Sequence, residues 1–192
     1  MSMRHNNIRD LEANMLREVC KDVKVEPELL PIGNADTGSS NVADKARLDI
    51  SAVGVWSAME RTFFDVRVFH PNSASYVDTS PQQLYIRHEK EKKRMHNDRV
   101  IQVEKGSFSP LIFSTTGGMG PECTKFHKRV AELISSKRGE LYSDVMNYIR
   151  TKIRFSVLKS TLDCYPWRER KTNKRVIDFR PFFEPYTRSG VI

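Results

Sequence analysis

The sequence has few cysteines, no long apolar run and no internal repeat. Its 192 residues include only Cys20, Cys123 and Cys164, and no two of them form a CxxC pair. So sparse a set excludes a disulfide framework and a zinc site, and it fits reduced thiols inside a cell. No run reaches the roughly 18 apolar residues that a membrane span needs. The N-terminus is polar and charged, unlike a secretory signal, so we expect an intracellular protein.

The charge of the chain is unevenly distributed. Its net charge is +8, yet residues 1–120 carry sixteen basic and sixteen acidic side chains, whereas residues 121–175 carry fourteen basic and six acidic ones. A positive excess confined to one segment indicates either a face for an anionic polymer such as DNA or RNA, or a well-solvated helix surface. The candidate nucleic-acid contacts in this segment are Arg129, Arg150, Lys152, Arg154 and Lys159.

Hydrophobic periodicity and turn residues predict the order of the secondary structure. Apolar residues at three- and four-residue steps predict helices, one of which begins at Ser80-Pro81 because proline is favoured at the first helical position. Runs rich in β-branched and aromatic residues predict strands. The predicted helices span residues 7–20, 81–97, 122–137 and 141–162. The predicted strands span residues 22–26, 46–55, 61–69, 100–103 and 108–114, the second and third forming a hairpin.

This order predicts an α/β fold, a three-layer sandwich with a central mixed sheet, an α-β-β-β-α-β core and extra C-terminal helices. Pro110 implies that the last strand lies at an edge or holds a bulge, because proline cannot donate to the sheet ladder. Residues 33–45 are polar and turn-forming, so we expect a loop there. Residues 164–192 lose all periodicity. We therefore expect one domain over residues 1–163, followed by a poorly ordered tail.

A glycine-rich segment, residues 115–121, leads into the third predicted helix. Free backbone N–H groups at a helix N-terminus can hold a phosphate. The segment lacks the Lys-Ser/Thr ending of a P-loop, however, and glycines also serve tight turns. Both interpretations stay open from the sequence.

Two acids stand among apolar neighbours in the predicted hairpin, Asp49 on its first strand and Asp65 on its second. Arg67 follows Asp65 by two residues and therefore points to the same face of the strand. A buried carboxylate is unfavourable unless it is paired, hydrogen-bonded or bound to a cation. The hairpin thus predicts either ion pairs with Arg67 or a divalent-metal site on the two carboxylates.

The element order, with acids on the second and third strands, resembles the PD-(D/E)XK nuclease superfamily. In that superfamily an Asp on the second strand and an acid-X-Lys motif on the third bind Mg²⁺ and position the attacking water. Asp49 matches the first acid, and Asp65-Val66-Arg67 stands where acid-X-Lys would stand.

Five motifs in order resemble, more narrowly, a module of retroelement-type open reading frames of animals. There the module is similar to the segment downstream of a reverse transcriptase. The resemblance covers about residues 4–163 and excludes the tail. The motifs are RHNNIRD (4–10), ARLDI (46–50), FFDVRVF (63–69), HEKEKKR (88–94) and STTGGMG (114–120).

The resemblance implies a metal-dependent endonuclease that nicks DNA by phosphodiester hydrolysis for insertion of the element. Asp49 and Asp65 would hold Mg²⁺ or Mn²⁺, and Glu12, or as a second choice Asp10, would be a further ligand. The substrate would be DNA or an RNA/DNA hybrid. The reverse transcriptase portion of the parent polyprotein would be a partner, and the location would be nuclear.

Arg67 departs from the family pattern. An arginine stays protonated, so it can bind a scissile phosphate but is a poor proton acceptor. Some superfamily members place the lysine on the following helix instead, which makes Lys90, Lys92 and Lys93 candidates. The missing strand lysine also favours an alternative, a catalytically inactive nucleic-acid-binding domain on a decayed nuclease fold. A third hypothesis is that the chain is a protein–protein interaction module. This hypothesis predicts no salt-dependent nucleic-acid binding.

Overall fold

The computed structural model describes residues 3–31 and 46–163. The loop predicted over residues 33–45 and the tail predicted over residues 164–192 lie outside these ranges. The strands are β1 (Lys21–Val25), β2 (Ile50–Val53), β3 (Arg61–Phe69) and β4 (Ser107–Ser114). They form one four-stranded mixed sheet in this order, in which β1, β2 and β3 are antiparallel neighbours and β4 runs parallel to β3.

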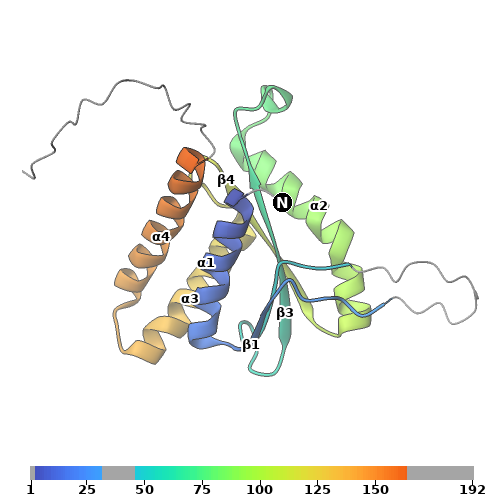
Figure 1. Cartoon of the computed structure of the whole chain (residues 1–192), viewed down its shortest axis with the longest axis vertical. Helices are drawn as coiled ribbons and strands as arrows, with labels where there is room; N and C mark the ends of the chain where they lie inside the picture. The colour runs from blue at the N-terminus through green and yellow to red at the C-terminus, as the bar shows by residue number, and fades with distance from the viewer. Residues whose placement is uncertain (1–2, 32–45, 164–192) are drawn as a thin grey trace, which may run out of the picture.

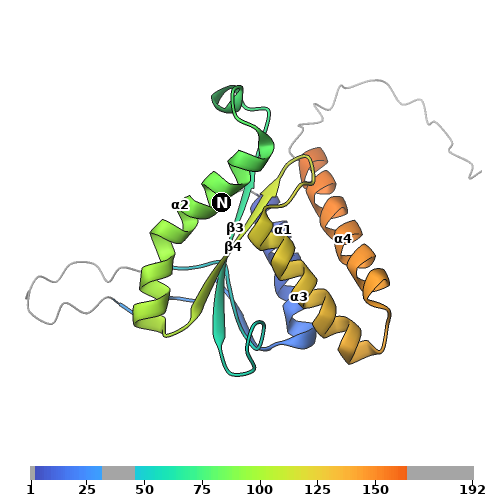
Figure 2. The ribbon, with the colours of Figure 1, turned by 180° about the vertical axis from the view of Figure 1, so that it is seen from behind.

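Helices cover both faces of the sheet. They are α1 (Met3–Val19), α2 (Pro81–Arg99), α3 (Pro121–Arg138) and α4 (Tyr142–Asp163), with a 3-10 turn η1 (Ala74–Tyr76) and a π-helical turn η2 (Val100–Glu104) flanking α2. Figures 1 and 2 show α1, α3 and α4 on one side and α2 on the other, so the predicted α/β sandwich with additional C-terminal helices is confirmed. α2 is the crossover that the parallel neighbours β3 and β4 require. No helix in the described ranges is long and apolar enough to cross a membrane.

The alternation of side chains along β3 decides where the site lies. Phe64 and Val66 are buried in the main core together with residues of α1 and α3. Phe63 is buried on the opposite face, in a second apolar cluster toward η2. Because successive side chains of a strand point to opposite faces, Asp65 and Arg67 share the face of Phe63 and point toward α2.

Short sequence signals set the ends of two helices. The Ser80 hydroxyl caps α2 by accepting the N–H of Gln83 at 3.4 Å, and Pro81 takes the first helical position, as predicted. α3 ends at Gly139, which has φ 69° and donates its N–H to the Ser135 carbonyl. Glycine is favoured there because the left-handed region is strained for other residues.

The strand predicted over residues 100–103 is wrong, because this segment continues α2 as η2. Val100 is fully buried in the cluster that contains Phe63 and Phe108. Packing therefore outweighs the β propensity of the segment. The prediction for Pro110 is confirmed, since β4 is an edge strand of the sheet.

The glycine-rich segment before α3 forms a turn, and the N-terminus of the helix behind it is already capped. The Glu89 carboxylate, on α2, accepts the backbone N–H of Glu122 at 2.9 Å. A side chain at Gly120 would collide with this carboxylate, so glycine permits its close approach. A carboxylate thus takes the place that a phosphate would take at this helix end, and the structure supports the turn interpretation.

Candidate active site

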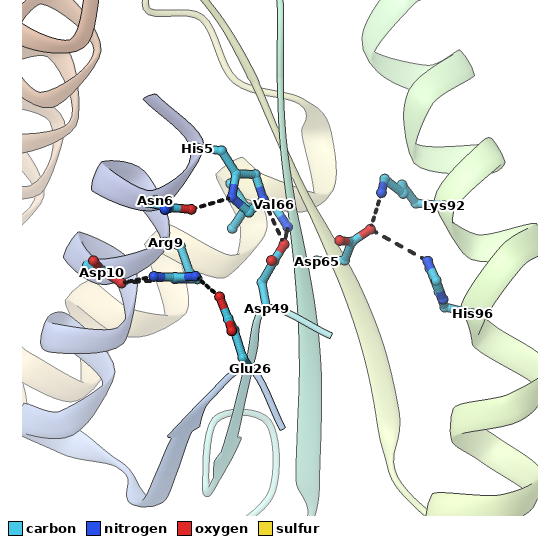
Figure 3. A network of polar contacts seen from close by, with 10 residues as sticks. All are labelled: His5, Asn6, Arg9, Asp10, Glu26, Asp49, Asp65, Val66, Lys92 and His96. Atoms are coloured by element: carbon cyan, nitrogen blue, oxygen red, sulfur yellow. Dashed lines mark hydrogen bonds and ion pairs between the residues drawn. The ribbon is translucent and has the colours of Figure 1, made fainter. Parts of the chain in front are cut away.

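Asp49 lies directly before Ile50, the first residue of β2, and its carboxylate is almost completely enclosed. Its Oδ2 accepts the backbone N–H of Val66 at 2.6 Å and lies 3.1 Å from Nε2 of His5 (Figure 3). The residue is only 3% exposed. His5 belongs to the first turns of α1, so this single carboxylate links α1 to β3.

Asp65 lies on β3 and points toward α2. Its Oδ2 is 2.5 Å from Nζ of Lys92 and 3.8 Å from Nε2 of His96, and the residue is 8% exposed (Figure 3). Lys92 and His96 are four residues apart on α2 and therefore share one helix face. Among the described residues, Oδ2 has no well-directed hydrogen bond. The contact with Lys92 is thus an ion pair that leaves the hydrogen-bonding capacity of this buried oxygen incompletely used.

The two carboxyl groups titrate as a pair. Burial raises the pKa of Asp65 to about 6 against the opposing charge of Lys92, and the neighbouring Asp49 carboxylate adds to the rise. Burial also acts to raise the pKa of Asp49, but hydrogen bonds from His5 and from the Val66 N–H outweigh it and hold that pKa below its ordinary value. Two like charges in one enclosed place favour a single shared proton. A bound cation would relieve the same repulsion.

Both carboxylates open on a cleft of about 400 Å³. Its basic lining residues are Arg4, Arg47, Arg67 and Lys92. Clefts lined by charge concentrate ligands of the opposite sign. An acidic floor inside a basic rim suits a ligand that brings phosphate groups together with a divalent cation.

Arg67 lies on the predicted face of β3, but it pairs with neither acid. Its guanidinium donates to the Glu91 carboxylate of α2 at 2.9 Å, and its side chain is 31% exposed. Asp49 and Asp65 take other partners, so the ion pairs with Arg67 that the sequence left open are not formed. The guanidinium stands at the rim of the cleft, where its planar fork can bind phosphate oxygens.

The three candidate lysines of α2 lie in different places. Lys92 contacts Asp65 in the cleft. Lys93 donates to Glu122 at the start of α3 at 2.7 Å, and Lys90 lines a groove along the outer side of α2. Neighbouring helix positions point in different directions, so Lys92 is the one of the three that lines the cleft.

Glu12 and Asp10, the candidates for a further metal ligand, do not line the cleft. Both oxygens of Glu12 lie within hydrogen-bond distance of His127 Nε2, at 2.9 and 3.1 Å, and both side chains are fully buried between α1 and α3. Asp10 is exposed and pairs with Arg9. The structure therefore does not bring either carboxylate to Asp49, because Glu12 already has a partner inside the core.

The five basic residues predicted to contact nucleic acid fall into two groups. Arg129 is half-buried, donates to the Val55 carbonyl at 2.8 Å and contacts Glu132 at 3.2 Å. The guanidinium of Arg129 is thus already hydrogen-bonded within the protein. The other four are exposed on α4: Arg150, Lys152, Arg154 and Lys159.

Sequence reasoning missed three groups of this site: the His5 and His96 imidazoles and the Val66 N–H. His96 carries a usable signal, since it follows Lys92 by four residues and so shares its helix face. His5 lies inside the first of the five motifs, but nothing local to it indicates contact with Asp49. The Val66 N–H is a backbone group, so no residue type in the sequence could have indicated that it donates to Asp49.

The donor set of the cleft fits a hard divalent cation. In the part of the chain that the structure describes, no group of three or more His, Cys, Asp or Glu side chains is placed to hold a metal ion. That result argues against a zinc-type site, which needs several protein ligands. Mg²⁺ is commonly bound by one or two carboxylates, with water and substrate phosphates completing its shell. Asp49 and Asp65, with its incompletely satisfied Oδ2, match this second pattern.

No protein-family model matches the chain, and a search of curated proteins finds no match either. The resemblance to PD-(D/E)XK nucleases stays a prediction from motifs, and the chemistry of the cleft has to carry the assignment of function.

Proposed function

We propose that the cleft between Asp49 and Asp65 hydrolyses phosphodiester bonds of DNA with Mg²⁺ or Mn²⁺. The observation that carries the proposal is the pair itself: two buried carboxylates, with a lysine 2.5 Å from one of them, open on one basic-rimmed cleft. Buried like charges are unfavourable, and groups with strongly shifted pKa values cluster at functional sites.

Asp49 and Asp65 would hold the cation. Bound there, it would lower the pKa of a water molecule and offset negative charge on the phosphate. His5 and the Val66 N–H keep Asp49 ionised and fixed in place, as the lowered pKa of Asp49 indicates. A ligand that is already ionised and oriented needs no reorganisation before it acts.

Lys92 supplies the positive charge that the family pattern expects from the strand. Its ammonium reaches Asp65 from α2, while Arg67 occupies the strand position. From there Lys92 can orient an attacking water or donate to a phosphate oxygen, and Arg67 can bind the same phosphate bidentately. The arrangement matches the pattern in which the lysine comes from the following helix.

Basic residues of α2 extend the rim of the cleft. Arg87, Lys90 and Arg94 line a groove of about 680 Å³ along the outer side of this helix. Glu91, the partner of Arg67, lines the same groove, so the groove and the cleft are neighbours. We expect the nucleic-acid backbone to follow these cations and binding to weaken with salt.

A second candidate function is metal-free nucleic-acid binding on an inactive nuclease fold. The Lys92–Asp65 ion pair favours it, because this contact partly neutralises Asp65 without a metal. Association with a reverse transcriptase and a nuclear location belong to either candidate and rest on the motif resemblance.

Nicking of supercoiled plasmid in Mg²⁺ or Mn²⁺ separates the two candidates. Asp65→Asn and Lys92→Ala should each slow nicking by on the order of 10²–10³-fold, because the first removes a metal ligand and the second removes a cation at the reacting phosphate. Lys93→Ala is the matched control, since it removes the adjacent lysine, which pairs with Glu122 outside the cleft. Plasmid binding without nicking by the unaltered chain, lost at high salt, would establish the inactive binding domain instead.

A further inference from the structure

The outward side of α4 exposes large apolar side chains. Phe155 is 67% exposed, Leu158 55% and Tyr148 48%. The opposite side of the helix is buried in the main core through residues such as Ile149 and Ile153. Exposed apolar residues that gather on one element mark interaction surfaces. These apolar side chains on the outer face of α4 are therefore not buried by packing within the described domain.

Beyond the exposed Asp144, which lies one turn before Tyr148 on this face, α4 carries only positive charge as far as Ser160. Its cations are Arg150, Lys152, Arg154 and Lys159, and no acid lies between Val145 and Ser160. None of the four forms an ion pair with another described residue. Cations elsewhere are commonly neutralised, as Arg61 is by Asp22 and Arg138 by Glu18. Lys152 lies over the ring of Tyr148, 5.3 Å from its centroid, so cation and aromatic form one surface.

The positive charge and the exposed aromatic rings together select the partner. A second copy of the chain would bring the same four cations against these, which is unfavourable. A duplex hides the faces of its bases, so it could engage the cations but would leave Phe155 and Tyr148 in water. Single-stranded nucleic acid offers phosphates and open base faces together, and such strands bind where aromatic side chains lie among basic ones. We propose that the outer face of α4 binds single-stranded nucleic acid, with bases stacked on Tyr148 and Phe155.

The position of α4 connects this face to the cleft. The C-terminal half of α4 lies beside the first turns of α1, where Asn7 donates to the Ser160 hydroxyl at 3.0 Å (Figures 1 and 2). Arg4 and His5, three and two residues before Asn7, line the cleft. An unpaired strand that leaves the cleft past the start of α1 would reach α4. On the proposed nuclease function, on which this step rests, the substrate is therefore DNA with an unpaired strand next to the scissile bond.

Fluorescence anisotropy tests the surface without catalysis. The full chain is titrated, in EDTA, against a labelled 20-nucleotide oligo-dT and against a 20-base-pair duplex. Tyr148→Ala and Phe155→Ala should each weaken oligo-dT binding by about 10-fold, the usual loss of one stacked base, and change duplex binding less than about 2-fold. Met59→Ala, an exposed apolar residue on another surface, is the control and should change neither affinity.

Two results would overturn the proposal. One is oligo-dT affinity that is unchanged in both α4 variants while circular dichroism shows them folded. The other is self-association of the unaltered chain that Phe155→Ala abolishes, which would assign the face to a second copy. The titration needs neither metal nor turnover, so failure of the nuclease and failure of the α4 surface are read separately.

Discussion

Two buried clusters in this protein place a carboxylate beside a histidine, and they differ in what surrounds them. The core pair, Glu12 and His127, is fully buried, and both carboxylate oxygens contact the imidazole. The cleft pair, Asp49 and Asp65, shares one enclosed place, and Asp65 Oδ2 lacks a well-directed hydrogen bond among the described residues. Burial of an acid therefore does not mark a site by itself. The proposed metal site rests on two further properties of the cleft pair, its incomplete hydrogen bonding and its access from a cleft.

The largest effect is expected at the core pair. Glu12→Ala should lower the free energy of unfolding by about 3–5 kcal/mol, because it leaves His127 buried without its partner. Urea unfolding of the full chain measures this loss. Asp10→Ala on the same helix is the control and should cost less than about 1 kcal/mol, since Asp10 is exposed and Arg9 keeps its second partner, Glu26. Equal losses of unfolding free energy in the two variants would contradict the structural role assigned to Glu12.

The two cleft acids should respond to neutralisation with opposite signs. In EDTA at pH 7, Asp65→Asn should raise the free energy of unfolding by on the order of 2 kcal/mol, because the raised pKa shows that its ionised form is unfavourable in the fold. Asp49→Asn should lower it by about 1–2 kcal/mol, because the lowered pKa shows that hydrogen bonds favour the ionised form. Destabilisation of similar size by both variants would contradict the description of the pair.

A smaller effect is expected from pH. The pKa of Asp65 is about 6 in the folded chain, against 3.8 for an unperturbed group. Between these values the folded state binds more protons than the unfolded state, so stability falls as pH rises through this window. Between pH 5 and pH 7 the metal-free chain should lose about 1 kcal/mol relative to Asp65→Asn. Parallel stability curves for the two proteins would show that Asp65 has no raised pKa.

Much of the fold could be predicted because its signals are local. Ser80 with Pro81 and Gly139 mark helix ends through their own backbone preferences, and the run 61–69 has the composition of a buried strand. The segment 100–103 could not be assigned this way. Its β-branched residues suit a strand, but burial of Val100 between distant aromatic residues keeps it helical.

The candidate site could be predicted only in part. Asp49 and Asp65 stood out because each interrupts an apolar run. The choice among Lys90, Lys92 and Lys93 depends on how α2 is rotated against the sheet, which its thin apolar side does not specify. Glu12 carries a carboxylate, as a metal ligand would, so its residue type does not show its role. Its partner His127 is 115 residues away in the sequence, so only the folded chain shows that it belongs to the core.

The most direct test of the cleft as a metal site is thermal unfolding of the full chain with and without Mn²⁺. Saturation at 100 times the dissociation constant should stabilise the unaltered chain by about 2.7 kcal/mol. Glu12→Gln, though less stable, should gain as much from Mn²⁺, because its change lies in the core. Asp65→Asn should gain little. No stabilisation of the unaltered chain by Mn²⁺ or Mg²⁺, or equal stabilisation of Asp65→Asn, would contradict a metal site on the two cleft carboxylates.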